Sequence, residues 1–174
     1  MKKIIETDRL ILRELSLDDT DSLYIILSDE ETMKHYPKPY TKEETKGWIE
    51  RSIKSYKEFG YGLWAVILKE SNQFIGQCGI SSQDIDGKVV PEIGYHINKK
   101  FWNKGYATEA AGACLEYGFT KLSLNEIFIH TYIKNIPSTK IAEKIGMIKR
   151  KEYAKVIKKD NVLMQHVVYS FKKK

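Results

Sequence analysis

The chain has 174 residues, of which 42% are apolar and 30% are charged, as in ordinary globular domains and unlike disordered or fibrous proteins. This length is enough to bury a sizeable core. Lysine and arginine outnumber aspartate and glutamate by 29 − 23 = 6. Such a basic excess suits a polyanionic cofactor or an acidic acceptor, and a solvated lysine-rich surface explains it equally well.

The sequence predicts neither a disulfide framework nor a metal site. Cys78 and Cys114 form no CxxC pair, and the histidines lack ligand spacing. Cys114 lies among small and apolar residues, as a buried structural thiol would.

No secretory signal or membrane span is predicted either. The basic start of the chain is interrupted by Glu6, Asp8 and Arg9 before an apolar core can form, and no run of about 18 apolar residues occurs. We therefore expect a cytoplasmic protein without a membrane partner.

The N-terminal half predicts one strand followed by two helices, over residues 4–14, 18–28 and 41–59. Leu10 and Leu12 fall on one face and Arg9, Ile11 and Arg13 on the other, which is the two-residue period of a strand. Thr41 and Glu44 match a capping box at the start of the second helix. Two helices thus precede the central sheet.

The remaining predicted elements are six strands and two helices. Strands are expected over 63–68, 74–80, 92–97, 126–132, 148–156 and 162–171, and helices over 105–122 and 137–145. The pairs Ser71-Asn72 and Asp86-Gly87 mark hairpin turns. The pattern predicts an α/β fold with a mixed, mainly antiparallel sheet, as a single domain over residues 1–174.

The segment 92–110 changes from strand to helix periodicity across a short loop centred on Gly105. A helix that begins there leaves its first N–H groups without partners and carries partial positive charge, so it attracts phosphate. The alternative is a plain turn with a permissive glycine. Neither GxxxxGK[ST] nor GxGxxG occurs in the chain, so an anion there belongs to another kind of ligand.

Four motifs in order resemble the GCN5-related N-acetyltransferases, closest to the branch of ribosomal-protein N-terminal acetyltransferases. They are ETDRLILRELSLDD, FIGQCGI, EIGY with the following WNKGYATEA, and NIPSTKIAEKIGM. The resemblance covers nearly the whole chain. It implies acetyl-CoA as cosubstrate and direct acyl transfer to an amine, and it is compatible with a homodimer. Neither cysteine has a partner that would activate it, so an acyl-cysteine intermediate is not expected.

The resemblance also assigns cofactor contacts. The N–H groups of residues 103–108 would hold the pyrophosphate of CoA, and main-chain groups of Tyr95 and Ile97 would pair with the pantetheine arm as an added strand. The family usually has Gln or Arg at the position of Trp102, a change that should be tolerated because the amides bind. The implied cofactor residues are Tyr95, Ile97, Trp102, Asn103, Lys104, Gly105, Tyr106, Ala107, Thr108, Asn135 and Ser138.

Two residues are candidates for proton transfer. Ser138 or a water would protonate the CoA thiolate, because Ala142 occupies the position of the family's usual tyrosine. Alternatively, Asn135 is a loop residue and Ser138 a helix cap. Glu92, at the start of its strand, would deprotonate the amine, and the alternative is an exposed strand-end glutamate. Burial would have to raise its pKa for that role.

The other histidines carry weaker predictions. His96 is the reserve base, on the same face of the strand as Glu92. His35, His130 and His166 show no partner in the sequence and are expected in packing or surface roles.

Acceptor choice should depend on the loop 33–40 and on the turn at 159–161. Tyr36 and Tyr40, together with Glu92, would line a slot for the amine, or the tyrosines simply close the core. Expected acceptors are a protein N-terminal amine, then a small amine such as a polyamine or antibiotic, then a lysine side chain.

The rival hypothesis is a non-catalytic basic module that binds RNA or the ribosome, prompted by the +6 charge and eleven tyrosines. The lysines are spread along the chain and no RNP-type or KH-type motif occurs, so a nucleic-acid partner is not expected.

Overall fold

The computed structural model describes residues 1–157 and 162–173 and contains one eight-stranded sheet in the order β1-β2-β3-β4-β5-β6-β8-β7. All neighbours are antiparallel except β5 and β6, which are parallel. The strands are β1 (Lys3–Glu6), β2 (Leu10–Glu14), β3 (Leu63–Leu68), β4 (Gln73–Ile85), β5 (Lys88–Ile97), β6 (Glu126–Tyr132), β7 (Ile148–Ile157) and β8 (Val162–Lys172). The predicted α/β fold with a mixed, mainly antiparallel sheet is confirmed.

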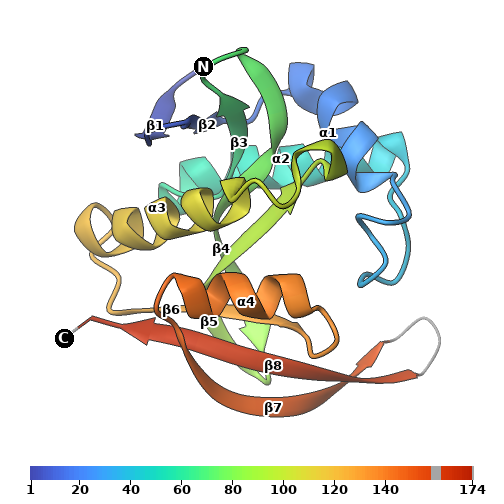
Figure 1. The fold of residues 1–174 in the computed structure, drawn as a ribbon, viewed down its shortest axis with the longest axis vertical. Coiled ribbons are helices and arrows are strands. Elements are labelled where there is room, and N and C mark those ends of the chain that lie inside the picture. Colours follow the sequence, from blue (N-terminus) through green and yellow to red (C-terminus); the bar gives the residue numbers. More distant parts are fainter. Residues whose placement is uncertain (158–161, 174) are drawn as a thin grey trace.

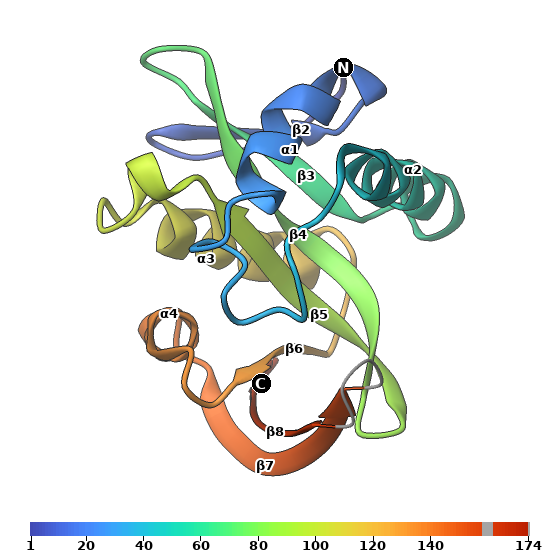
Figure 2. The same cartoon turned by 90° about the vertical axis from the view of Figure 1, so that its right-hand side faces the viewer.

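Helices cover both faces of the sheet (Figures 1 and 2). They are α1 (Thr20–Leu27), α2 (Lys42–Phe59), α3 (Tyr106–Thr120) and α4 (Ile136–Lys144). Alternate residues of β3 divide the core: Trp64 and Val66 pack in the cluster that contains α3, and Ala65 packs in the cluster formed with α1 and α2. No helix of the described ranges is long and apolar enough to cross a membrane.

The strand predicted over 4–14 is wrong as a single element, because the chain turns back at residues 7–9 to form the β1–β2 hairpin. Thr7 makes the turn: its N–H donates to the Leu10 carbonyl at 2.9 Å, and its hydroxyl accepts the Leu10 N–H at 3.0 Å. A threonine hydroxyl that bonds the backbone in this way favours a turn over an extended strand.

The two hairpin turns indicated by the sequence are confirmed. Asn72 (φ 52°), Asp86 (φ 54°) and Gly87 (φ 79°) all adopt the left-handed backbone that such turns require. The strands around the second turn are longer than predicted, since β4 continues to Ile85 and β5 begins at Lys88. Glu92 therefore lies in the middle of its strand and not at its start.

The boundaries of helices α1 to α4 agree with the sequence prediction to within two residues. The first helix, expected over 18–28, begins at Thr20 because a 3-10 turn (Leu17–Asp19) forms its first residues. The predicted capping box of α2 is present, with the Thr41 hydroxyl accepting the Glu44 N–H and the Glu44 carboxylate accepting the Thr41 N–H. A second 3-10 turn (Lys99–Phe101) links β5 to the loop before α3.

Candidate active site

The loop before α3 has the backbone of an anion site. Asn103 (φ 61°) and Gly105 (φ 82°) are left-handed, and the first bond within the helix runs from the Glu109 N–H to the Gly105 carbonyl at 3.0 Å. No side chain caps this helix, in contrast to α2. The N–H groups of Tyr106, Ala107 and Thr108 thus precede the helical hydrogen bonds and can donate to an oxyanion.

Arg9 braces this loop, a contact that the sequence did not reveal. Its Nη1 donates to the Lys104 carbonyl at 3.0 Å, and its guanidinium lies 4.5 Å from the centre of the Tyr106 ring. Glu109 accepts from Arg9 Nε and from the Thr7 hydroxyl, each at 2.6 Å. The first carboxylate after the loop is therefore neutralised by Arg9.

The strand before the loop has an edge available to a ligand. The parallel ladder between β5 and β6 contains the pair Glu92 and Phe128, with no pair farther along β5 among the described residues. The Asn98 N–H donates to Ile75 on the β4 side, so by alternation the main-chain groups of Tyr95 and Ile97 point toward the opened edge. This geometry suits strand addition by an extended pantetheine arm.

Trp102 takes one of these main-chain groups. Its indole Nε1 donates to the Ile97 carbonyl at 2.7 Å, and its ring packs against the larger core cluster. Trp102 thereby holds the loop to the end of β5, and Ile97 retains its N–H toward the edge.

Ser138 is buried, and its Oγ lies 2.7 Å from the Tyr95 hydroxyl. Asn135 caps α4, with its side-chain oxygen accepting the Ser138 N–H at 3.4 Å. The alternative in which Ser138 caps the helix is wrong, because Asn135 has that role and Ser138 lies in the first helical turn. Burial raises the pKa of the Tyr95 phenol, so this hydroxyl pair is uncharged at neutral pH.

Glu92 is buried, with an 11% exposed side chain, so the alternative of an exposed strand-end glutamate is wrong. Its Oε1 lies 2.6 Å from His130 Nδ1 and accepts the His130 main-chain N–H at 3.3 Å. The structure thus gives His130 a partner that the sequence did not show. The two residues are 38 positions apart and meet only because β5 and β6 are parallel neighbours.

His96 lies four residues after Glu92 along β5. Its contacts make it unsuitable as the reserve base. The Trp48 indole donates to Gln77 Oε1 at 3.1 Å, which leaves Gln77 Nε2 to donate to His96 Nδ1 at 3.0 Å. The proton of the neutral ring is then on Nε2, which is buried without a partner among the described residues. Burial lowers the pKa of His96 to about 4.

Aromatic rings of the loop 33–40 and of α2 pack around His96 and Trp48. Tyr36 lies 5.0 Å from the His96 ring and Tyr40 lies 5.6 Å from the Trp48 ring, measured between ring centres. Tyr36 is 40% exposed, yet its pKa is raised by burial of the hydroxyl and then by the Glu92 charge. Tyr40 also lines a groove of about 400 Å³ with Lys38, Glu44 and Arg51. The predicted loop 33–40 thus lies beside Glu92, whereas the turn at 159–161 lies outside the described residues.

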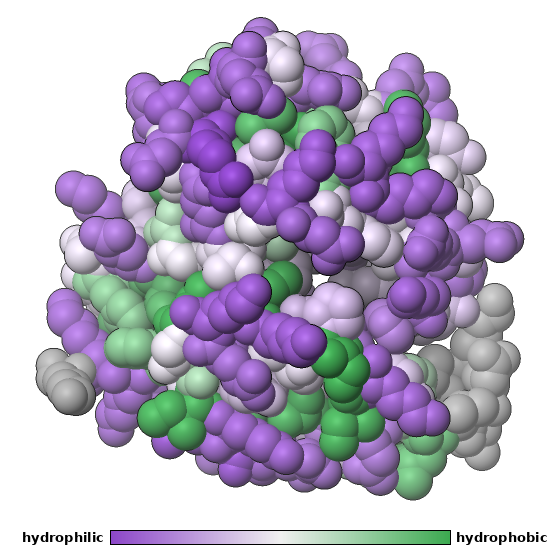
Figure 3. All heavy atoms as spheres, viewed as in Figure 1, coloured by the Kyte–Doolittle hydropathy of each residue, from purple (hydrophilic) through white to green (hydrophobic). Residues whose placement is uncertain are grey.

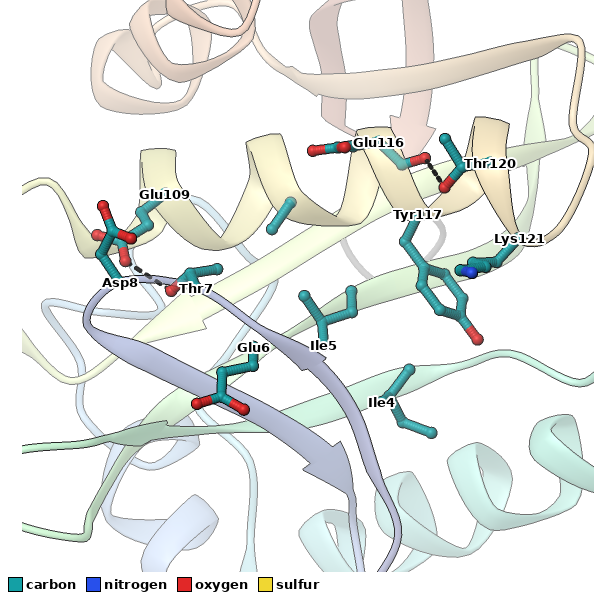
Figure 4. A pocket seen from close by; sticks show the side chains of 11 residues that line it. Ile4, Ile5, Glu6, Thr7, Asp8, Glu109, Glu116, Tyr117, Thr120 and Lys121 are labelled. Atoms are coloured by element: carbon teal, nitrogen blue, oxygen red, sulfur yellow. Dashed lines mark hydrogen bonds between the residues drawn. The ribbon is translucent and has the colours of Figure 1, made fainter.

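A second groove, of about 410 Å³, lies between the β1–β2 hairpin and α3 (Figure 4). Its lining includes the carboxylates of Glu6, Asp8, Glu109 and Glu116. Among the described residues, Lys121 is the one basic side chain of this lining, so the groove carries more acidic than basic groups and suits a polyphosphate less well than the loop before α3 does. In Figure 3 the face that bears α3 and α4 is mostly hydrophilic and is recessed between the two helices.

The cysteines and potential metal ligands form no further centre. Cys78 and Cys114 are both buried, with their sulfurs 3.6 Å apart beneath α3. Burial raises the pKa of the Cys114 thiol, which makes it a poor nucleophile. Among residues 1–157 and 162–173, no group of three histidine, cysteine or acidic side chains is placed to hold a metal ion.

Comparison with known proteins decides the family. The family model described as the acetyltransferase (GNAT) domain matches residues 9–148. The chain belongs to the GNAT acetyltransferase family. As a GNAT enzyme it transfers the acetyl group of acetyl-CoA to an amine nitrogen, and the anion loop, the opened edge of β5 and α4 fit that cosubstrate.

Three known proteins illustrate the relationship. The N-acetyltransferase YnaD of Bacillus subtilis is 34% identical over 167 residues, which is 95% of each chain. A GNAT-family acetyltransferase from Bacillus anthracis has a crystal structure with a TM-score of 0.81 and 32% identity, covering 97% of both chains. The ribosomal L7/L12 alpha-N-protein acetyltransferase RimL, solved with coenzyme A, has a TM-score of 0.82 at 15% identity and covers 98% of both chains, a likeness of fold.

Proposed function

We propose that this GNAT enzyme acetylates a primary amine that reaches Glu92 between the loop 33–40 and β5, the acceptor being a protein N-terminal amine or a small amine such as a polyamine or antibiotic. The observation that carries the proposal is the position of Glu92. It is a buried carboxylate beside the opened edge of β5. Burial raises the pKa of the Tyr36, Tyr95 and Tyr153 hydroxyls, and the Glu92 charge adds to that rise.

The cofactor contacts follow from the loop and the strand edge. The N–H groups of residues 103–108 would bind the pyrophosphate, with Lys104 adding positive charge, and Tyr95 and Ile97 would align the pantetheine arm. Acetyl-CoA supplies the thioester that the amine attacks and from which the CoA thiolate departs. The uncapped start of α3 supports this assignment.

Proton transfer would involve groups at two ends of the site. Glu92 and its bonded partner take up the proton that the amine loses, and Ser138 donates toward the sulfur. The 2.7 Å contact between the hydroxyls of Ser138 and Tyr95 adds a phenol to that path. The Tyr95 phenol would replace that of the family's usual tyrosine, whose position Ala142 occupies. Asn135 supports this arrangement by capping α4 and fixing the turn that carries Ser138.

The acceptor end favours a cationic amine. The Glu92 charge acts on Tyr36, whose ring lies 5.0 Å from that of His96, and the His96 ring lies 6.1 Å from that of Trp48. A carboxylate near such a row of rings offers both charge and π-faces to an ammonium group. Because His96 is neutral at pH 7, it adds no repulsion. The exposed edge of Tyr36 leaves a way in from solvent.

The first test is a thermal-shift titration with acetyl-CoA. Ligand at about 100 times its dissociation constant should add about 2.7 kcal/mol of stability. A panel of peptide N-termini, polyamines and aminoglycoside-type amines, followed by release of free CoA thiol, then identifies the acceptor. Glu92→Gln and Ser138→Ala should slow turnover and leave the acetyl-CoA shift nearly intact. No acetyl-CoA shift together with tight RNA binding would favour the rival RNA-binding module, which the family match does not support.

A further inference from the structure

The imidazole of His130 is held in one orientation by the carboxylate of Glu92. His130 lies on β6 and Glu92 on the neighbouring strand β5, close to the point where the two strands separate. Its Nδ1 is 2.6 Å from Glu92 Oε1, and the side chains are only 15% and 11% exposed. Because the same oxygen also accepts the His130 main-chain N–H at 3.3 Å, the backbone and the ring fix the carboxylate together.

This contact determines which ring nitrogen is available. An ionised carboxylate only accepts hydrogen bonds, so Nδ1 carries the proton and Nε2 has the lone pair. Nε2 makes no hydrogen bond within the described residues, and it is not one of the buried atoms that lack a partner, so solvent reaches it. A carboxylate that orients an imidazole in this way is the arrangement of a general base with its positioning residue.

We propose that His130 Nε2 is the catalytic proton acceptor for the incoming amine and that Glu92 is the positioning residue. This inference rests on the proposed function and specifies which atom takes the proton. Glu92 is less suited to the role, because its Oε1 is already engaged by two N–H groups. A reference carboxylate, with a pKa of about 4.3, is also a weaker base than a reference imidazole at about 6.5.

The step balances without any further reactant. The ammonium gives one proton to Nε2, which later releases it to water. The nitrogen lone pair forms a bond to the acyl carbon, and the carbon–sulfur bond breaks with its electron pair on sulfur. The thiolate gains a proton through the Ser138 and Tyr95 hydroxyls. The nitrogen loses its second proton as the amide forms, and this proton restores the one that the hydroxyls gave up.

Several titratable groups face the pair and enter any pH profile. They are Tyr36 from the loop 33–40, Tyr95 from β5, Tyr153 from β7 and His166 from β8. The His166 ring centre lies 5.7 Å from that of His130. The pKa of His166 is lowered by burial, so it is largely neutral at pH 7 and does not oppose a second charge at His130.

The test is chemical rescue. His130→Ala should lower kcat by about 100-fold or more while the acetyl-CoA thermal shift persists, and added imidazole should restore a large part of the rate. Ser138→Ala is the matched control and should not respond to imidazole. His130→Gln, whose amide can still donate to Glu92, covers the case in which the alanine variant fails to fold, and it should be slow with the acid limb of the pH profile removed.

The outcomes separate the two proposals. Full rate and an unchanged pH profile in His130→Gln overturn the role of His130, as does a slow, folded His130→Ala that imidazole does not rescue. Glu92→Gln should shift the pH profile of kcat and remain slower than the parent, and an unshifted profile contradicts a positioning role. If the unaltered enzyme neither binds acetyl-CoA nor releases thiol with any amine, the proposed function itself fails.

Discussion

Arg9 and Glu109 form the contact that ties the first hairpin to the anion loop. The Glu109 carboxylate accepts from the Arg9 guanidinium at 2.6 Å and from the Arg9 main-chain N–H at 3.0 Å, and the same guanidinium donates to the Lys104 carbonyl. Burial raises the pKa of Glu109, but the hydrogen bonds from Thr7 and Arg9 outweigh it and the net pKa is lowered. Glu109 is therefore ionised at neutral pH and fixes Arg9 in place.

Replacing Arg9 should weaken acetyl-CoA binding. Arg9→Met removes both the brace on the Lys104 carbonyl and a positive charge beside the loop, and the two effects act in the same direction. The Arg9 side chain is 46% exposed, so solvent screening limits the effect to about 1 kcal/mol, or roughly a fivefold rise in Kd. Isothermal titration with acetyl-CoA measures it.

Arg9→Lys and Lys3→Met are the matched comparisons. Arg9→Lys keeps the charge but cannot bridge Glu109 and the Lys104 carbonyl at once, so its Kd should lie between those of the parent and Arg9→Met. Lys3→Met removes an exposed cation from the same hairpin and should leave Kd unchanged. Equal affinities for the parent and Arg9→Met would show that the loop needs no brace.

Local signals in the sequence predicted much of the fold. The turns at Asn72 and Asp86-Gly87 were predictable because only a few residue types tolerate a left-handed backbone. The first hairpin was missed because its turn depends on the Thr7 side chain, which the alternating pattern of residues 4–14 obscures. Periodicity measures which face is buried and does not report where the chain reverses.

The site was predictable only in part. The sequence pointed to the loop around Gly105 and to Tyr36 and Tyr40 within their own segments, and the roles of these residues stay predictions. The partners of Glu92 and Ser138 were not, because His130 is 38 residues and Tyr95 is 43 residues away from them. Tyr95 was assigned main-chain contacts alone, since a single strand gives no sign of which side chain α4 will approach. Sheet order decides these pairs, and no local pattern encodes it.

Tyr95→Phe should slow turnover and leave acetyl-CoA affinity nearly unchanged. The substitution removes the hydroxyl that lies 2.7 Å from Ser138 Oγ, and the ring that packs against the core remains. If the two hydroxyls act in one proton path, kcat should fall by about 10-fold to 100-fold in Tyr95→Phe and in Ser138→Ala. Single-turnover kinetics at saturating acetyl-CoA measure each variant.

The double variant is the decisive comparison for this pair. Residues that act as a unit are not additive, so Tyr95→Phe with Ser138→Ala should be about as slow as the slower single variant. Multiplicative losses would indicate that the two hydroxyls act independently. A Tyr95→Phe enzyme with the parent's rate would remove the phenol from the proposed path.

Two glycines of α3 should respond to alanine in opposite directions. A Cβ on Gly118 would lie 2.3 Å from the Ile127 Cδ1 and 3.0 Å from the Ile80 Cδ1, whereas a Cβ on Gly112 would meet the Ile145 Cγ2 at 3.6 Å, an ordinary contact. Gly118→Ala should cost about 1 to 3 kcal/mol through overpacking. Gly112→Ala should gain about 0.5 to 1 kcal/mol, because alanine is the better helix former. Urea unfolding measures both, and a stabilised Gly118→Ala would contradict the close approach of α3 to β6.

His96 should make stability depend on pH in the mildly acidic range. Its pKa is lowered by burial from the ordinary 6.5 to about 4, so between these values the unfolded chain binds a proton that the folded protein does not. The free energy of unfolding therefore rises with pH across this window; the stability is fully present above about 6.5 and is lost as the pH falls toward 4. From pH 7 to pH 5 the loss of unfolding free energy due to His96 should be about 2 kcal/mol.

His96→Gln should remove this loss. The lowered pKa values of His35 and His166 contribute equally to both proteins, so the difference between two urea-unfolding series isolates His96. Parallel curves for the parent and His96→Gln would mean that the ring is charged in the folded enzyme. The Nε2 hydrogen would then need a carboxylate, and none of the described residues supplies one there.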